Sequence, residues 1–183
     1  MSDKDPRSVF IITGETGSGK TTFLLKLIEE LRGKALSIAG FAALSVPGDG
    51  PSGSFNILDL ASGKILPLAS RRFTEGWEKV GKFYFNPEGI LMGKKILEDP
   101  VIINNDLIVV DEIGPFELEG EIWADSITRI LTRQCCSILL VVREQLVAQV
   151  AQQWSLKDAM IIEIGQTKPD QAAAMILLQT AGA

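Results

Sequence analysis

Gly14-Glu15-Thr16-Gly17-Ser18-Gly19-Lys20-Thr21 is the stretch that decides the fold of this chain. It matches the pattern Gly-x-x-x-x-Gly-Lys-Ser/Thr, in which backbone N–H groups of a glycine-rich loop surround the phosphates of a nucleotide. The glycines allow positive φ and close approach of the backbone, the lysine reaches the β- and γ-phosphates, and the Ser/Thr hydroxyl binds Mg²⁺. We therefore predict that this loop and Thr22 bind a nucleoside triphosphate, with Lys20 on the phosphates and Thr21 on the metal.

The residues on both sides of the loop have the patterns of a strand and a helix. Residues 9–12, Val-Phe-Ile-Ile, form a short apolar run typical of a buried parallel strand. After the loop, apolar side chains recur at helical spacing, at Phe23, Leu24, Leu27, Ile28 and Leu31. Gly33 then stands where a glycine often ends a helix. This order of strand, loop and helix predicts phosphate binding at the N-terminus of the helix.

The composition limits both architecture and chemistry. The chain has 183 residues, a formal net charge of −5, no histidine, and two cysteines, the adjacent Cys135 and Cys136. Its length predicts one domain, 1–183, and the cysteines suit core positions in a reducing compartment. Without histidine, a general base has to be a carboxylate, and a cation at the transition state has to be Lys, Arg or a metal. The negative charge argues against a nucleic acid partner and the short apolar runs against a membrane, so we expect a cytoplasmic protein.

Strand and helix patterns alternate along most of the chain, which predicts an α/β fold with a mainly parallel sheet and helices on both faces. Strands are predicted at residues 35–41, 83–85, 107–112, 137–142 and 160–164, and helices at 87–97, 120–134, 146–154 and 167–180. Residues 42–72 interrupt the alternation, because the runs 54–60 and 64–69 flank a turn at 61–63 and predict an antiparallel hairpin. We interpret residues 42–72 as a β-rich insertion, through which a protein partner could bind.

A second motif lies at residues 107–115, where an apolar strand ends in Asp111 and Glu112. Downstream of a phosphate loop, an acid in this place is the Walker B residue that holds Mg²⁺, so we assign Asp111 to the metal together with Thr21. Hydrolysis also requires a base that deprotonates or orients water, and without histidine Glu112 is the best-placed one. Because neighbouring residues of a strand point to opposite faces, the two roles would be separated. The alternative is that Glu112 only caps a loop or helix.

An arginine is expected beside these carboxylates. P-loop proteins with this Asp-Glu pair usually have an extra strand between the strand of the phosphate loop and the Walker B strand, and we predict that residues 137–142 form it. Arg143 would then lie at the carboxyl edge of the sheet, where ligands of open α/β sheets bind. There it could contact the γ-phosphate and act in catalysis with Lys20 and Glu112. Arg71 and Arg72, which follow the hairpin, are alternatives for this role.

Four segments carry a family resemblance: the loop with Thr22, Gly40-Phe41, Val80-Gly81-Lys82, and above all residues 110–118, Val-Asp-Glu-Ile-Gly-Pro-Phe-Glu-Leu. They resemble the small nucleoside-triphosphatases first described from thermophiles and also called cancer-related nucleoside-triphosphatases. The resemblance implies a three-layer P-loop fold similar to RecA-type ATPases and small kinases. It also implies Mg²⁺-dependent release of the γ-phosphate from NTPs with broad base tolerance. On the matching positions, Lys20 and Thr21 would bind phosphate and metal, Asp111 metal, and Glu112 water.

The segment expected near the base departs from this family. Such proteins often have an Asn-Arg pair after the last strand, where this chain has Gln166-Thr167-Lys168. Residues 167–170, Thr-Lys-Pro-Asp, fit the guanine-reading pattern Asn/Thr-Lys-x-Asp of GTPases. A threonine N-cap followed by proline and aspartate is also an ordinary helix start. The sequence therefore leaves the choice between ATP and GTP open.

A nucleoside-triphosphate phosphohydrolase is the leading hypothesis for the function. A kinase would share the loop, the metal and the size, and would transfer the phosphoryl group to a small molecule or a nucleotide. A nucleotide-switched binding protein is a third hypothesis, in which slow hydrolysis times a partner interaction through residues 42–72. Exposed aromatic residues such as Phe73, Trp77 and Phe83 could serve that interaction. The sequence leaves the oligomeric state open.

Overall fold

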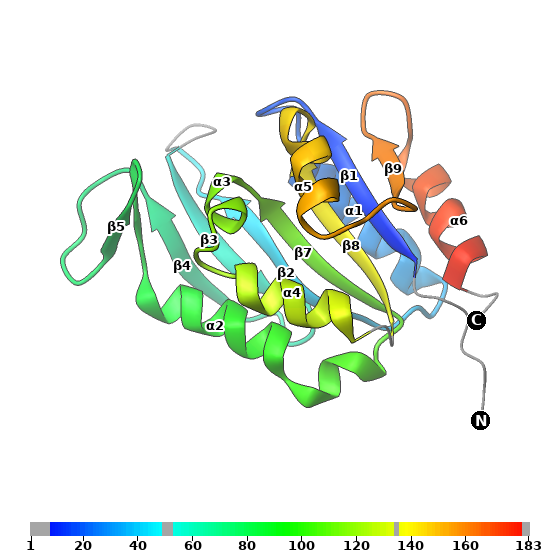
Figure 1. Cartoon of the computed structure of the whole chain (residues 1–183), viewed down its shortest axis with the longest axis horizontal. Helices are drawn as coiled ribbons and strands as arrows, with labels where there is room; N and C mark the ends of the chain where they lie inside the picture. The colour runs from blue at the N-terminus through cyan, green and yellow to red at the C-terminus, as the bar shows by residue number, and fades with distance from the viewer. Residues whose placement is uncertain (1–7, 49–52, 134–135, 181–183) are drawn as a thin grey trace.

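A computed structural model of the chain describes residues 8–48, 53–133 and 136–180. In this part of the chain the central layer is a nine-stranded sheet, and helices cover both of its faces (Figure 1). The strands are β1 (Val9–Gly14), β2 (Ile38–Ser45), β3 (Ser54–Asp59), β4 (Ile65–Ser70), β5 (Glu78–Val80), β6 (Phe83–Phe85), β7 (Leu107–Ile113), β8 (Ser137–Arg143) and β9 (Met160–Glu163). The helices are α1 (Lys20–Gly33), α2 (Pro87–Glu98), α3 (Pro115–Leu118), α4 (Ala124–Thr132), α5 (Val147–Gln153) and α6 (Pro169–Thr180), with 3-10 turns η1 (Pro100–Asn104) and η2 (Glu144–Leu146).

The sheet consists of a parallel part and an antiparallel part. Its order is β5-β6-β4-β3-β2-β7-β8-β1-β9. The strands from β2 to β9 in this order pair in parallel, whereas β3, β4, β6 and β5 pair antiparallel. Strand β8 lies between β1 and β7, which confirms the extra strand predicted between the phosphate loop and the Walker B strand. The α/β fold with an antiparallel hairpin, β3–β4, is confirmed as well.

Both faces of the parallel strands are buried, so these strands read as continuous apolar runs. Alternate residues belong to different cores: Phe10 and Ile12 of β1 lie on the side of α1 and α6, and Ile11 lies on the side of α2, α4 and α5. Figure 1 shows the two layers, with α1 behind the sheet and α2, α4 and α5 in front. Among the described residues, no helix combines the length and the apolar character needed to cross a membrane.

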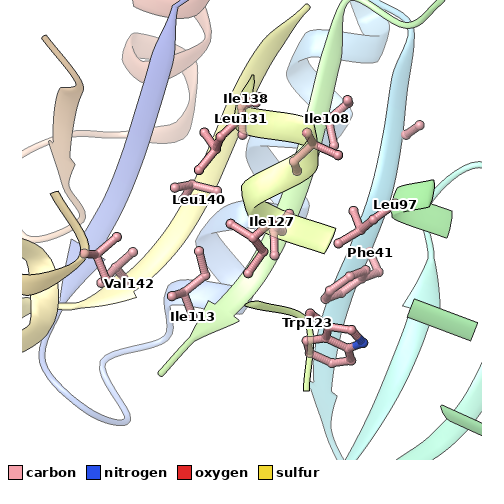
Figure 2. Close-up of a cluster of buried hydrophobic side chains, with 14 of the residues drawn as sticks. Phe41, Leu97, Ile108, Ile113, Trp123, Ile127, Leu131, Ile138, Leu140 and Val142 are labelled. Atoms are coloured by element: carbon pink, nitrogen blue, oxygen red, sulfur yellow. The ribbon is translucent and has the colours of Figure 1, made fainter. Parts of the chain in front are cut away.

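The core on the side of α2 and α4 is centred on an aromatic pair. The rings of Phe41 and Trp123 lie 4.5 Å apart between centroids, with Leu97 of α2 beside them (Figure 2). The indole N–H of Trp123 donates to the carbonyl of Ile90 at 3.2 Å. At Gly93 of α2 a Cβ would lie 2.5 Å from the indole nitrogen, so a side chain at this position would displace the tryptophan. This packing fixes α2 and α4 on the sheet.

Several predicted boundaries are wrong. Gly33 lies inside α1, and Ala35 (φ 62) adopts the left-handed conformation after the helix instead. Strand β2 begins at Ile38 rather than at residue 35 and continues to Ser45. Residues 38–41 pair in parallel with β7, whereas residues 42–45, predicted as the start of the β-rich insertion, continue the same strand and pair antiparallel with β3. The helix predicted from residue 120 begins at Ala124, after the short α3, and its predicted end at residue 134 lies outside the described residues. Cys136 is buried as expected, and Cys135 lies outside the described residues.

Candidate active site

The phosphate loop joins β1 to α1 and has the backbone that its glycines allow. Gly17 (φ 77) and Gly19 (φ 90) are in the left-handed region, and a Cβ at either position would meet nothing within 4 Å, so conformation rather than space requires glycine there. At Gly14 the reason is space, because a Cβ would lie 2.9 Å from Cγ1 of Ile164. The Ser18 hydroxyl donates to the carbonyl of Glu15 at 2.7 Å and closes the base of the loop.

Lys20 is the first residue of α1 and lies under the loop. Its Nζ donates to the carbonyls of Gly14 at 3.1 Å and Glu15 at 2.7 Å. The side chain is only 5% exposed, and burial lowers the pKa of the ammonium group from its usual value. The loop carbonyls therefore hold a buried cation next to the backbone N–H groups that would receive phosphate.

Asp111 connects β7 with α1 and β2. Its Oδ2 accepts hydrogen bonds from the Thr21 hydroxyl and from the Ala43 backbone N–H, each at 3.0 Å. The carboxyl is fully buried, and its other oxygen, Oδ1, has no hydrogen-bond partner. Burial raises the pKa of Asp111 to about 7, with the charge of Glu112 acting in the same direction. A buried carboxylate oxygen without a partner is the feature expected where a cation completes the site.

Glu112 occupies a β-bulge, which corrects the predicted strand alternation. Along the ladder, Val110 pairs with Leu140 and Ile113 with Val142, so β7 has one more residue than β8 over this step. Glu112 (φ 64) adopts the left-handed conformation within the bulge. Asp111 is fully buried, whereas the side chain of Glu112 is 31% exposed and lines a cavity with Arg143.

Arg143 at the end of β8 pairs with Glu112. The guanidinium Nη2 lies 3.3 Å from Oε2 of Glu112, and both side chains are about one third exposed, at 32% and 31%. The register of β1 with β8 places Arg143 opposite Gly14, the first residue of the loop. The rival Arg71 lies over the ring of Phe83, 5.5 Å from its centroid. Arg143 thus lies beside the loop at the carboxyl edge of the sheet.

A cavity of about 150 Å³ collects most of these groups. Its lining includes Lys20, Glu112, Arg143 and, from the loop and the start of α1, Thr16, Gly17, Gly19, Thr21 and Thr22. Ser18 instead donates to the carbonyl of Glu15, and the same carbonyl accepts the ammonium group of Lys20. Sequence reasoning missed Ser45 and Phe55, which line the same cavity. It also missed the Ala43 N–H, for which no sequence signal exists, since every residue except proline has this donor.

Glu117 is a further buried carboxyl beside this site. It lies on α3 and is 3% exposed, and its Oε2 accepts the Gly114 N–H at 2.9 Å. Burial raises the pKa of Glu117 to about 7, and the charge of Glu112 contributes in the same direction. The signal for it was present in the run 110–118, but the sequence alone assigned it no role.

The segment 167–170 starts α6, with one difference from the predicted cap. The helix begins at Pro169, so Lys168 rather than Thr167 occupies the N-cap position. The Lys168 N–H donates to the side-chain oxygen of Gln171 at 3.0 Å, and its carbonyl accepts the N–H of Ala172. Gln171, at the third position of the helix, thus accepts the N–H of the N-cap residue through its side chain, which is one half of a capping box.

A family model described as NTPase matches residues 9–177. The chain belongs to this NTPase family. Curated relatives named Nucleoside-triphosphatase THEP1 include that of Archaeoglobus fulgidus, which is 37% identical over 123 residues, or 67% of this chain and 70% of the relative. That of Methanothermobacter thermautotrophicus is 32% identical over 143 residues, or 74% of this chain and 77% of the relative. The family resemblance drawn from the loop and from residues 110–118 is confirmed, and with it the expectation of an NTPase-family enzyme.

Two solved structures share the fold of this NTPase-family chain. A human cancer-related nucleoside triphosphatase, solved in solution, aligns with a TM-score of 0.71 at 21% identity and covers 97% of this chain and 98% of its own. The crystal structure of THEP1 from Aquifex aeolicus aligns with a TM-score of 0.67 at 27% identity and covers 92% and 94%. At this level of identity the first similarity shows the fold alone.

Proposed function

We propose that this NTPase-family chain, acting as one P-loop domain, is a Mg²⁺-dependent nucleoside-triphosphate phosphohydrolase that releases the γ-phosphate. The observation that carries the proposal is the single cavity lined by the loop, Lys20, Glu112 and Arg143, with Asp111 buried beside Thr21 at its edge. These groups supply the phosphate cradle, a cation, a base and a metal ligand that phosphoryl transfer to water requires.

The donor set at Thr21 and Asp111 fits Mg²⁺. A hydroxyl oxygen and a carboxylate are hard oxygen ligands, and Oδ1 of Asp111 is buried without a partner. Among the described residues there is no group of three or more acids, cysteines or histidines that could hold a metal by themselves. This agrees with a cation that the protein holds through few side chains, with phosphate oxygens and water completing its shell. When bound, Mg²⁺ would neutralise charge on the β- and γ-phosphate oxygens.

The chain's own residues supply the remaining steps. Lys20, already buried under the loop, places its ammonium group against the β- and γ-phosphates. Glu112 accepts a proton from the attacking water or orients it, and Arg143 holds the carboxylate of Glu112 and faces the charge that develops on the γ-phosphate. We include a broad base preference in the proposal, because the start of α6 accounts for residues 167–170 without a guanine.

Phosphate release from ATP, GTP, CTP and UTP tests the proposal directly. We expect release that requires Mg²⁺ and falls by about 10²–10³-fold in Lys20→Ala, since a preorganised cation facing the phosphate is removed. Lys26→Ala, at an exposed position of α1, is the matched control and should retain the activity. Equal phosphate release by Lys20→Ala and wild type, or full activity in EDTA, would contradict the proposal.

A further inference from the structure

A second cavity, of about 180 Å³, adjoins the one at the phosphate loop. The two cavities share four lining residues, Ala43, Phe55, Glu112 and Arg143. The second cavity extends away from β1 toward the antiparallel part of the sheet, where β3, β4, β6 and α3 contribute to its walls. Its function is not explained by the hydrolysis of a triphosphate, which the first cavity serves.

The walls of the second cavity are mainly aromatic. Phe55, Phe83, Phe85, Phe116 and Trp123 line it. The neighbouring phenylalanines meet edge to face, with ring centroids 6.0 Å apart for Phe55 and Phe83 and 5.5 Å apart for Phe85 and Phe116. A cavity of roughly 150 Å³ lined by apolar side chains holds a benzene molecule. The space and its lining therefore suit one planar ring.

Charged groups on the same walls exclude a purely apolar occupant. Lys82, Glu112, Glu117 and Arg143 also line the cavity. Glu117 is nine-tenths or more buried, with 3% exposed, and reaches the cavity from α3. A ligand without polar atoms would remove the exposed parts of these groups from water and offer no hydrogen bond in return, which is unfavourable. The occupant should thus carry hydroxyl or amino groups on its ring.

The position of the cavity relative to the loop indicates what such a ligand would do. The proposed metal ligands Thr21 and Asp111 share a hydrogen bond, and Thr21 lines the first cavity together with Glu112 and Arg143. On the proposed function, the γ-phosphate of a bound nucleotide would therefore face Glu112 and Arg143. These two residues form the shared wall. A hydroxyl of a ligand in the second cavity would lie next to the γ-phosphate, in the place that a water molecule takes during hydrolysis.

We propose that the aromatic cavity binds a single-ring aromatic alcohol and that the enzyme transfers the γ-phosphoryl group to its hydroxyl. The alcohol oxygen forms a bond to the γ-phosphorus, and the bond from that phosphorus to the β–γ bridging oxygen breaks. The nucleoside diphosphate leaves with the bridging oxygen, and the proton of the alcohol passes to the Glu112 carboxylate. This inference rests on the proposed nucleotide site, and water is the acceptor when the cavity holds no alcohol.

The test compares nucleoside diphosphate with free phosphate. The protein is incubated with Mg²⁺ and ATP labelled on the γ-phosphate, together with benzyl alcohol or pyridoxine. We expect more ADP than free phosphate and a labelled phosphate ester with at least one of these probes. Glycerol, which has hydroxyls but no ring, is the control and should give equal ADP and phosphate. Equal amounts of ADP and free phosphate with every probe would overturn the inference and leave the proposed hydrolysis intact. So would a phosphate ester of glycerol as abundant as the esters of the aromatic alcohols. If no ADP forms at all, the proposed nucleotide site is wrong as well.

Two variants of the cavity wall localise the transfer. Ala69→Leu adds bulk at a position that is 4% exposed and lines the cavity, and we expect the kcat/KM for the alcohol to fall by about tenfold or more. Phe116→Leu removes a ring from the partly exposed α3 and should also raise the KM for the alcohol. Ala148→Leu, at an exposed position of α5, is the matched control. Melting temperatures establish that each variant folds. If both wall variants keep the wild-type kcat/KM for the alcohol, this cavity is not the acceptor site.

Discussion

Replacing Glu112 by glutamine separates the chemistry of hydrolysis from nucleotide binding. Glutamine has nearly the same shape as glutamate and keeps an oxygen and a nitrogen for hydrogen bonding, but it cannot accept a proton from water. The backbone at this position is left-handed (φ 64), and glutamine should adopt that conformation as readily as glutamate does, so the bulge should persist. Lys20, Thr21 and Asp111 keep all their contacts with each other and with the loop.

The size of each effect follows from the geometry. The ion pair of Glu112 with Arg143 has an N–O distance of 3.3 Å, and both side chains are about one third exposed. Its loss should therefore lower the free energy of unfolding by no more than about 1 kcal/mol. Loss of a general base lowers kcat by about 10²–10⁴-fold, which corresponds to roughly 3–5 kcal/mol in the activation free energy. The change in catalysis should thus far exceed the change in stability.

The assay measures phosphate release at saturating NTP together with nucleotide affinity from a fluorescent analogue. We expect Glu112→Gln to bind nucleotide with an affinity close to that of wild type and to release phosphate at least about 10²-fold more slowly. Glu144→Gln removes the same charge at an exposed residue next to Arg143 and is the control. Turnover by Glu112→Gln within a few-fold of wild type would refute the assignment of Glu112 as the base.

Three further predictions concern stability. Gly40→Ala should lower the free energy of unfolding in urea by about 3–5 kcal/mol, because the backbone has φ +108 and a Cβ would lie 2.0 Å from the carbonyl oxygen of Val109. The control Gly63→Ala, with φ +74 and no atom within 4 Å of the added Cβ, should lower it much less. Similar losses of stability for the two variants would contradict this explanation. The buried carboxyl of Glu117 has its pKa raised from 4.5 to about 7, so it binds a proton more tightly in the folded than in the unfolded protein, and stability from it is lost as pH rises from about 4.5 through 7. In unfolding experiments at a series of pH values, the stability of Glu117→Gln relative to wild type should increase by on the order of 3 kcal/mol over this range. A difference in stability that does not change with pH would contradict the raised pKa of Glu117. Asn86→Ala removes the side chain that caps α2 and should cost about 1 kcal/mol in the same unfolding experiment, and an unchanged midpoint would show that this cap contributes nothing.

The central fold could be predicted because its signals are local. The loop from Gly14 to Thr21 and its flanking apolar runs specify a strand, a turn and a helix without reference to the rest of the chain. The Asp-Glu pair at residues 111–112 allowed the position of β8 between β1 and β7 to be predicted. That position places Arg143 at the carboxyl edge of the sheet, opposite Gly14. The residue types of the candidate site were thus recognisable from the sequence.

Features that depend on register or on distant elements could not be predicted. The bulge at Glu112 arises from how β7 pairs with β8, and a run of strand-forming residues contains no mark of one extra residue. Ala35 takes the left-handed conformation expected near Gly33, because hydrogen bonds from the backbone after α1 set the turn at that residue. The residues that line the aromatic cavity come from segments that are far apart in the sequence, from β2 to β8, so no local sequence pattern predicts the cavity.

The position of β1 in the sheet has a consequence for synthesis of the protein. Strand β1 is made before both of its neighbours, β8 and β9, which lie more than a hundred residues later in the chain. A nascent chain that has not yet reached residue 163 therefore has a phosphate loop whose strand lacks part of its pairing. Both edges of β1 are open to wrong partners during this time, which makes the early chain dependent on protection from aggregation. Nucleotide binding should thus appear only after β9 has been made, as a single event rather than a gradual gain.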